Sequence, residues 1–262
     1  MQFLDMNPII DKIRKEIEEK NKGLVILTDN NPDNLSYCHS IIKVNEKEKF
    51  LENINIVNIE DRDWQYKVFD LEPEKVYIMN SCASKEYVLE VCGDLEYIGT
   101  TIYSEIATEI GISIFPTVDA VIDTIMYWNK NTDLSGKVIT IANRSELIGK
   151  PLVNSLINLN ATINWVHTKT KEAIKLISML NSDIIVTAAG RPNTFYQCDS
   201  LKNQLVVDVG INVVDGRICG DWNMEEVKDY NVTFTPNPGG IGKLTVYELF
   251  KQLCMNRIII DY

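Results

Sequence analysis

The chain has 262 residues, of which 45% are hydrophobic, and a formal net charge of −11 at pH 7. This length suits one large domain or two ordinary ones, and the hydrophobic content excludes wholesale disorder. The acidic balance argues against nucleic acid as a partner, because contacts to phosphates need a basic face. No apolar run approaches the roughly 20 residues that a bilayer-spanning helix needs, so we expect no membrane span.

The six cysteines are scattered along the chain without a C-x-x-C pair, and there are only two histidines. Such usage predicts reduced thiols, with neither a disulfide framework nor a metal site. The N-terminal stretch carries acidic and basic side chains throughout and lacks the apolar core of a signal peptide. We therefore expect a soluble cytoplasmic protein.

Helical and strand patterns alternate along the first hundred residues, which predicts a three-layer α/β domain. In the first helix, Ile9, Ile13 and Ile17 recur at helical spacing, and Asn34 stands where it would cap the second helix. We expect helices at 8–22, 34–50 and 86–92 and within 98–111, and strands at 24–27, 54–59 and 76–79.

The second half repeats strand–helix–strand units, which predicts a parallel sheet with right-handed crossovers. Thr117 is the expected N-cap of its first helix, and Pro151 suits the first turn of its second. We expect helices at 118–128, 152–159 and 171–180, and strands at 137–142, 162–166, 183–188, 205–209 and 232–234. The chain thus divides into a first domain, 1–112, and a second, 113–245, with the last helix, 246–262, free to return to the first.

Ligands bind parallel sheets at the carboxyl ends of the strands, where four polar loops are expected. Arg144 and Ser145 stand in the first loop, directly before a helix, and offer a planar cationic fork and a hydroxyl for phosphate. Thr168 and Lys169 follow the next strand, where an NAD enzyme would place an acidic residue for the ribose diol. A hydroxyl and a cation there favour NADP over NAD, although the G-x-G-x-x-G fingerprint is absent.

A proline- and glycine-rich loop, T-P-N-P-G-G-I-G-K-L-T (235–245), connects the last strand to the last helix. Its glycines let backbone N–H groups approach a ligand at the start of a helix. Taken alone, the same residues also fit an ordinary turn.

Together these loops resemble the bifunctional methylenetetrahydrofolate dehydrogenase/cyclohydrolase family. The resemblance covers nearly all of 113–250 in order and rests on G-K-V-I-T-I-A-N-R-S-E-L-I-G-K-P-L (136–152), N-A-T-I-N-W-V-H-T-K-T (160–170), A-A-G-R-P (188–192), V-V-D-V-G-I-N (206–212), G-D (220–221) and the loop 235–245. It implies a Rossmann-like NAD(P) domain at 113–245, a folate domain in the first half, and a homodimer formed through the nucleotide domain.

The resemblance also assigns residues to the two ligands. For the cofactor it implies Asn143, Arg144, Ser145, His167, Thr168, Ala189, Gly190, Pro192, Gly210, Ile211 and Asn212. In the family the loop 235–245 lies beside nicotinamide and pterin, so Pro238, Gly239 and Gly240 are implied substrate contacts. Lys243 stands where the family has proline. By themselves, His167 and Asp208 fit loop support better than catalysis.

The first half resembles the family more weakly. Residues 23–37 match, without a gap, the strand and helix that lead to the family's active-site tyrosine, which falls on Tyr37. Asn80 and Glu96 stand in place of a glutamine and a folate-contacting aspartate, so Tyr37, Asn80 and Glu96 are the implied catalytic residues, with Tyr37 and Asn80 also contacting substrate. The family's catalytic lysine is replaced by Ile41, and Lys43 lies about 200° further round the helix.

These departures affect the two family reactions differently. Hydride removal needs cofactor geometry but no proton acceptor. Cyclohydrolase chemistry adds water and draws about 10²–10⁴-fold from an acid/base group, which an isoleucine cannot supply. The expectation is NADP-dependent oxidation of methylenetetrahydrofolate, with NAD as the other possible acceptor and with weak or absent cyclohydrolase activity. Two alternatives stay open: a dehydrogenase for another substrate, and a non-catalytic protein that binds NADP or a pterin.

Overall fold

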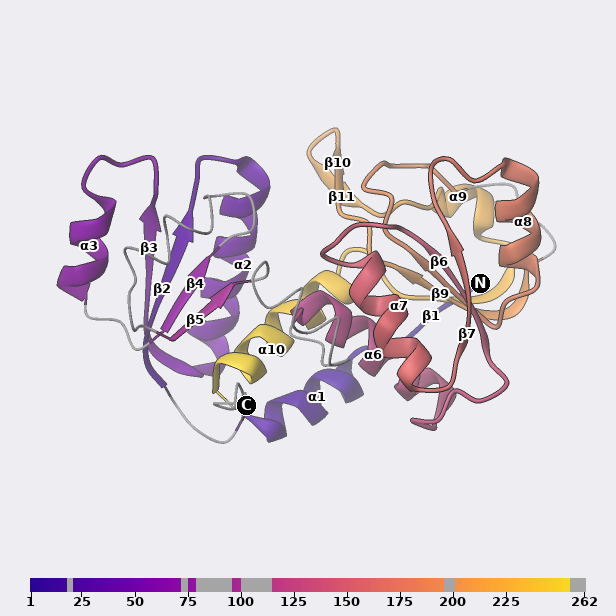
Figure 1. Cartoon of the computed structure of the whole chain (residues 1–262), viewed down its shortest axis with the longest axis horizontal. Coiled ribbons are helices and arrows are strands. Elements are labelled where there is room, and N and C mark those ends of the chain that lie inside the picture. The colour runs from indigo at the N-terminus through magenta and orange to yellow at the C-terminus, as the bar shows by residue number, and fades with distance from the viewer. Residues whose placement is uncertain (18–20, 72–74, 79–95, 100–114, 196–200, 255–262) are drawn as a thin grey trace. The chain divides into compact units, whose positions relative to one another are not determined.

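The computed structural model describes residues 1–17, 21–71, 75–78, 96–99, 115–195 and 201–254 (Figure 1). The chain forms two compact units. The first comprises 1–12 and 107–245, and the second comprises 13–106 and 246–262. The expected domain junction at 112/113 lies outside the described residues. None of the described helices is long and apolar enough to cross a membrane.

The first unit contains a six-stranded sheet in the order β1-β12-β9-β8-β6-β7, in which every neighbouring pair is parallel (Figure 1). Its strands are β1 (Gln2–Phe3), β6 (Val138–Ala142), β7 (Thr162–Val166), β8 (Ile184–Thr187), β9 (Lys202–Asp208) and β12 (Asn231–Phe234). The helices described wholly within this unit are α6 (Pro116–Asn129), α7 (Gly149–Asn158), α8 (Glu172–Leu180) and α9 (Met224–Val227), and β10 (Asn212–Val214) forms a hairpin with β11 (Arg217–Cys219). The expected Rossmann-like parallel sheet is confirmed.

The order of the strands creates a switch point beside β6. From β6 the chain passes through α7 to β7 on one side, and then through α8 to β8 on the other side. The first crossover therefore runs away from β8, and the second returns past β6, which places a switch point at the carboxyl ends of β6 and β8. This edge is where a doubly wound sheet binds its ligand.

Aromatic packing supports the central strands behind this edge. The rings of Trp222 and Phe234 meet edge to face at 5.5 Å between centroids, and Phe195 stacks on Trp222 at 5.4 Å. Trp222 also donates its indole N–H to Thr187 Oγ1 at 3.0 Å. Because a buried indole N–H needs a hydrogen-bond acceptor, Thr187 at the end of β8 fixes the position of the Trp222 ring in the core.

The second unit contains a four-stranded parallel sheet in the order β3-β2-β4-β5. Its strands are β2 (Asn21–Thr28), β3 (Leu51–Asn58), β4 (Lys75–Ile78) and β5 (Glu96–Gly99). Its described helices are α2 (Pro32–Glu48), α3 (Trp64–Leu71), the end of α1 (Asn7–Glu16) and the greater part of α10 (Ile241–Cys254). Phe250 packs on Phe50 with 5.2 Å between ring centroids, so the last helix contributes to the core of this unit.

Several element boundaries differ from those expected. Asn34 lies inside α2, which already begins at Pro32. Helix α6 begins at Pro116, so Thr117 is not its N-cap; the capping position is Phe115, which makes no side-chain hydrogen bond. In both helices a proline occupies the first turn, where its fixed φ fits and its missing N–H is not needed. Helix α10 begins at Ile241, five residues before the expected start.

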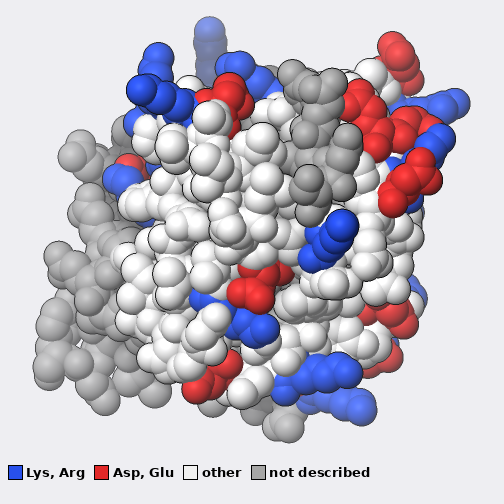
Figure 2. All heavy atoms as spheres, turned by 90° about the vertical axis from the view of Figure 1, so that its right-hand side faces the viewer, with Lys and Arg blue, Asp and Glu red and all other residues white. Residues whose placement is uncertain are grey.

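Charges of both signs are dispersed over the face of the first unit shown in Figure 2. On the face shown in Figure 2, lysine and arginine lie singly or in small groups among acidic and uncharged side chains. The described residues of that face therefore form no continuous basic area of the kind that nucleic acid requires.

Candidate functional site

The candidate site lies at the carboxyl edge of the six-stranded sheet. Every expected cofactor residue except Asn212, which begins β10, stands on a loop that follows β6, β7, β8 or β9, and the proline- and glycine-rich loop follows β12. Because all these strands are parallel, the five loops leave the same edge. The structure thus brings together residues that are up to 97 positions apart, from Asn143 to Gly240.

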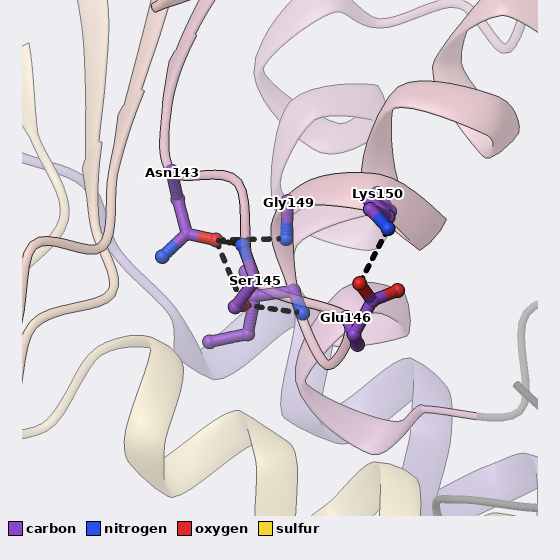
Figure 3. A network of polar contacts seen from close by, with 6 residues as sticks. Asn143, Ser145, Glu146, Gly149 and Lys150 are labelled. Carbon is purple, nitrogen blue, oxygen red and sulfur yellow. Dashed lines mark hydrogen bonds and ion pairs between the residues drawn. The ribbon is translucent and has the colours of Figure 1, made fainter. Parts of the chain in front are cut away.

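Asn143 organises the loop after β6 (Figure 3). Its Oδ1 accepts hydrogen bonds from Ser145 N at 2.7 Å, Ser145 Oγ at 2.8 Å and Gly149 N at 3.0 Å, while its Nδ2 donates to Ala188 O at 2.6 Å. A Cβ on Gly149 would lie 2.4 Å from Asn143 O, so glycine is required at the start of α7. One amide thus closes this loop and joins it to the end of β8.

The same loop carries the expected phosphate-binding arginine. Arg144 is exposed, and the described residues provide no hydrogen bond or ion pair to its guanidinium. Its neighbour Glu146 is instead paired with Lys150, one turn along (Figure 3). Arg144 therefore remains available to an anion, whereas Ser145 is held by Asn143 and itself accepts from Ile148 N at 3.1 Å.

The loop after β7 is closed by its own residues. His167 N donates to Thr170 Oγ1 at 3.0 Å, and His167 Nδ1 accepts from Lys169 N at 3.2 Å. The imidazole is thereby used to shape the turn, as loop support requires. Thr168 and Lys169 are exposed at the tip of the loop, and the described residues provide no partner for either side chain.

A buried carboxylate fixes the conformation of the loop after β8. Asp221 is fully buried and accepts from Ala189 N at 2.5 Å and from Arg191 N at 3.2 Å. Its Oδ1 also accepts from Asn212 Nδ2 at 3.0 Å. The exposed loop Ala189–Pro192 is therefore shaped by a residue that lies about 30 positions further along the chain.

A second buried carboxylate lies beside the first. Asp208 is 3% exposed and accepts hydrogen bonds from the backbone N–H groups of Gly210, Asp221 and Trp222. Burial raises the pKa of Asp208 to about 6, and the neighbouring charge of Asp221 acts in the same direction, against the hydrogen bonds from the backbone.

The loop after β12 joins the same cluster. Thr235 Oγ1 accepts from Asp208 N at 2.9 Å, and Asn237 Nδ2 donates to Gly210 O at 2.6 Å. The Asn237–Pro238 peptide bond is cis. Gly239 has a φ of +100°, which favours glycine, and a Cβ on Gly240 would lie 2.1 Å from Pro236 O. Backbone packing thus explains two of the glycines in this loop.

The expected folate side is described only in part. Tyr37 is half-buried on α2, and Ile41 on the same helix is fully buried. Lys43 is exposed. Asn80 lies outside the described residues. Glu96 is the first residue of β5, and its side chain also lies outside what the structure describes. Of the implied substrate contacts in the last loop, Pro238 and Gly239 are exposed and Gly240 is buried.

Sequence reasoning missed the roles of Asp221, Thr235 and Asn237. Their side chains act on backbone that lies 27 to 32 positions away, so no local pattern reveals them. The one sequence feature that could have indicated the role of Asp221 is the presence of two acidic residues close to glycines, in D-x-G (208–210) and G-D (220–221). Within the described residues, no group of three or more His, Cys, Asp or Glu side chains is placed to hold a metal ion.

Residues 116–258 match the family described as tetrahydrofolate dehydrogenase/cyclohydrolase, NAD(P)-binding domain. The chain is 31% identical over 278 residues to the bifunctional protein FolD of Dictyoglomus thermophilum, covering 96% of this chain and 95% of that protein. It is 39% identical over 124 residues to the protein of the same name from Clostridium botulinum strain Alaska E43, covering 47% of this chain and 43% of that protein.

Solved structures give a consistent result. The bifunctional methylenetetrahydrofolate dehydrogenase/cyclohydrolase FolD of Campylobacter jejuni is 26% identical, with a TM-score of 0.76 and 96% coverage of both chains. The corresponding enzyme of Trypanosoma brucei, solved with NADP and an inhibitor, is 20% identical with a TM-score of 0.77, covering 97% of this chain and 96% of that one. At this identity the latter shows the shared fold alone.

Proposed function

Because the chain belongs to the tetrahydrofolate dehydrogenase/cyclohydrolase family, we propose that it oxidises methylenetetrahydrofolate to methenyltetrahydrofolate with NADP as hydride acceptor, and that its cyclohydrolase activity is weak or absent. The observation that carries the second part is Ile41, a fully buried apolar side chain at the position of the family's catalytic lysine. The enzyme is expected to act in the cytoplasm as a homodimer.

The proposed cofactor site is the carboxyl edge of the six-stranded sheet. Hydride transfer depends on holding two reactants in the correct geometry, and hydrogen bonds from Asn143 and Asp221 hold the loops after β6, β8 and β9 in defined conformations that suit this. The residues proposed to contact the dinucleotide are Asn143, Arg144, Ser145, His167, Thr168, Ala189, Gly190, Pro192, Gly210, Ile211 and Asn212. Gly190 has a φ of +63° and open space where a Cβ would lie, which leaves room for a ligand above the loop.

The preference for NADP rests on charge at two loops. Arg144 and Lys169 are exposed cations at the ends of β6 and β7, and Thr168 adds a hydroxyl next to Lys169. A 2′-phosphate is stabilised by such groups, whereas the ribose diol of NAD is usually bound by an acidic residue. Glutamine in place of Arg144 should raise KM for NADP at least tenfold and change KM for NAD less than threefold; equal changes for both cofactors would contradict the assignment.

The proposed loss of cyclohydrolase activity follows from the chemistry of the two steps. Tyr37, Asn80 and Glu96 are proposed as the catalytic residues, and Tyr37 and Asn80, with Pro238, Gly239 and Gly240, as substrate contacts. None of the side chains at these positions is a lysine. Lys43 lies on a different face of helix α2 from Tyr37 and Ile41. Hydride transfer requires no protein base, but the addition of water to the methenyl cation requires one.

One absorbance assay tests the whole proposal. Purified protein is mixed with methylenetetrahydrofolate and either NADP or NAD, and the methenyl product band is followed. The proposal expects the band to rise with NADP and then to persist, because hydrolysis is slow. Rapid decay of the band would contradict the cyclohydrolase statement. Absence of product with both cofactors, while NADP still raises Tm, would instead favour a binding protein or another substrate.

The proposed homodimer forms through the nucleotide unit. Apart from the proposed cofactor contacts, that unit exposes large apolar side chains that an interface could cover: Ile157, Trp165, Ile174, Ile177, Val213 and Ile218. Light scattering of the eluted protein should give twice the mass of one chain. Separate Ile177→Lys and Val213→Lys variants then show which of α8 and the hairpin β10–β11 contributes, since only a covered position should yield monomer.

A further inference from the structure

The two buried carboxylates of the site are arranged reciprocally. Asp208 lies two residues before Gly210, and Asp221 directly follows Gly220. A Cβ on Gly210 would lie 2.2 Å from Asp221 Oδ1, and a Cβ on Gly220 would lie 1.9 Å from Asp208 Oδ2. Each glycine therefore makes room for the carboxylate of the other segment. These two glycines are required by packing, whatever ligand binds above them.

We propose that Asp221 is a positioning residue for the nicotinamide dinucleotide: its buried carboxylate gives the loop Ala189–Arg191 and the base of the hairpin β10–β11 their binding conformation. The inference rests on the proposed function, because it takes these loops to be the cofactor site. It goes beyond that function by assigning a role to a side chain that lies beneath the site and is fully buried.

The hydrogen bonds of Asp221 explain how this positioning works. Its carboxylate accepts the N–H groups of Ala189 and Arg191, the two residues on either side of Gly190. The described residues provide no acceptor for the N–H of Gly190. The carboxylate thus occupies two of three successive donors and leaves the middle one for a ligand. An exposed loop without such an anchor would be expected to sample several conformations.

The second loop is fixed through Asn212. Its amide donates to Asp221 Oδ1 and to Gly220 O, both at 3.0 Å, which ties the first residue of β10 to the chain that follows β11. Ile211 immediately before it is 62% exposed. A buried carboxylate therefore determines where an exposed apolar side chain of the site stands.

Asp208 in turn holds the backbone of Asp221 in place. It accepts the backbone N–H of Asp221 through both carboxylate oxygens, at 3.1 and 2.9 Å, and the N–H of Trp222 at 3.3 Å. Asp208 thus positions the backbone of Asp221, and Asp221 positions the loop. This order makes Asp221 the residue whose change should act most directly on cofactor binding.

The test uses Asp221→Asn in the full-length protein, with Asp215→Asn as the matched control. Asp215 is exposed at the tip of the same hairpin, so the control makes the same change of charge on the same element. Whichever way the new amide is turned, its NH₂ faces an N–H donor that the carboxylate had accepted. We expect Kd for NADPH, from quenching of its fluorescence, to rise at least tenfold in Asp221→Asn and less than twofold in Asp215→Asn.

Steady-state kinetics separates positioning from general damage. KM for NADP should rise with Kd, whereas KM for methylenetetrahydrofolate should stay within twofold. Tyr37, Asn80 and Glu96 belong to the other unit, and the loop that carries Pro238–Gly240 is held by hydrogen bonds to Asp208 and Gly210 rather than to Asp221. Equal losses for both substrates would show that Asp221 is merely structural. An Asp221→Asn protein that binds NADPH within twofold of the wild type would overturn the inference.

Hydrogen exchange of the unliganded wild-type protein keeps the inference testable if the variant does not fold. The amides of Ala189 and Arg191 should be protected although both residues are exposed, while those of Gly190 and Asn193 should exchange rapidly. Rapid exchange at all four amides would overturn the inference. If the wild-type protein binds neither NADPH nor NADH, the proposed cofactor site itself fails, and this outcome is distinct from the others.

Discussion

The phenol of Tyr247 donates a hydrogen bond to Glu48 Oε1 at 2.8 Å, and the two residues are 199 positions apart. Arg14 joins them, since its Nη2 donates to Glu48 Oε1 and its Nε lies 2.9 Å from Oε2. One carboxylate at the end of α2 thus binds the last helix, α10, and the first helix, α1, within the second unit. Glu48 therefore connects the first and the last of the described helices.

Removal of the Tyr247 hydroxyl should weaken this connection measurably. Tyr247 is 1% exposed, so Tyr247→Phe leaves the ring packed and deletes one hydrogen bond to a charged acceptor. We expect the free energy of unfolding to fall by about 1–2 kcal/mol. Urea denaturation measures this, with Tyr66→Phe as control, because Tyr66 is 74% exposed and should change stability by less than about 0.5 kcal/mol.

The lowered pKa of Glu48 implies that the contribution of this carboxylate to the free energy of unfolding is lost in acid. Burial raises the pKa of this carboxyl, but hydrogen bonds from Arg14, Tyr247 and Lys47 outweigh burial and leave the pKa below its usual range. A lowered folded-state pKa contributes stability above the unfolded value near 4.5, and that stability is lost as the pH falls through the folded value. Glu48→Gln should therefore be less stable than the wild type at pH 7, and the difference should shrink below about pH 4.5. A constant difference would contradict this.

Asp208 predicts the opposite dependence. Its pKa is raised to about 6, so its contribution to stability is complete below the unfolded value of 3.8 and is lost as the pH rises through 6. A shift of this size corresponds to at most about 3 kcal/mol. Carbon NMR of the Asp208 carboxyl should show a midpoint near pH 6. The stability of Asp208→Asn, which has lost an acceptor, should be lower but should no longer decline between pH 4 and 6.

Lys243 tests which ligand the last loop serves. It lies in the first turn of α10, where the first helical hydrogen bond runs from Leu244 N to Gly240 O at 3.1 Å, so its own N–H is not needed by the helix. Lys243→Pro should fold with nearly unchanged stability. We expect KM for folate to change more than KM for NADP. Lys243→Ala separates loss of the charge from the effect of the ring, and a larger effect on NADP would assign the loop to phosphate.

Much of the fold followed from local patterns. The β-branched run Thr162–Val166 was predicted with the same limits as β7, because its residues favour an extended backbone and its loops are clearly polar. The two-residue strand β1 was missed, since it is held only by pairing with β12. The hairpin β10–β11 was also missed, although Asp215 and Gly216, both with positive φ, are the usual turn for such a hairpin.

The candidate site was predictable to the level of loops. Parallel strands place their carboxyl ends on one edge, so polar loops in sequence become neighbours in space. The internal support of those loops was not predictable, because Asn143 and Asp221 bond to backbone 45 and 32 positions away. Sequence patterns readily show which residues contact a ligand. They show less readily which residues hold those ligand-contacting residues in place.

Ile41 allows the proposed loss of cyclohydrolase activity to be reversed. Lysine at this fully buried position should lower the free energy of unfolding by about 2–5 kcal/mol at pH 7, because an ammonium group must leave water or disturb its surroundings to reach it. His39→Lys on the same helix is the control, since His39 is exposed and should change stability little. In the folded fraction, Ile41→Lys should speed methenyltetrahydrofolate hydrolysis by about 10²-fold or more. If the variant folds and gains no hydrolysis, the missing lysine is not what limits this reaction.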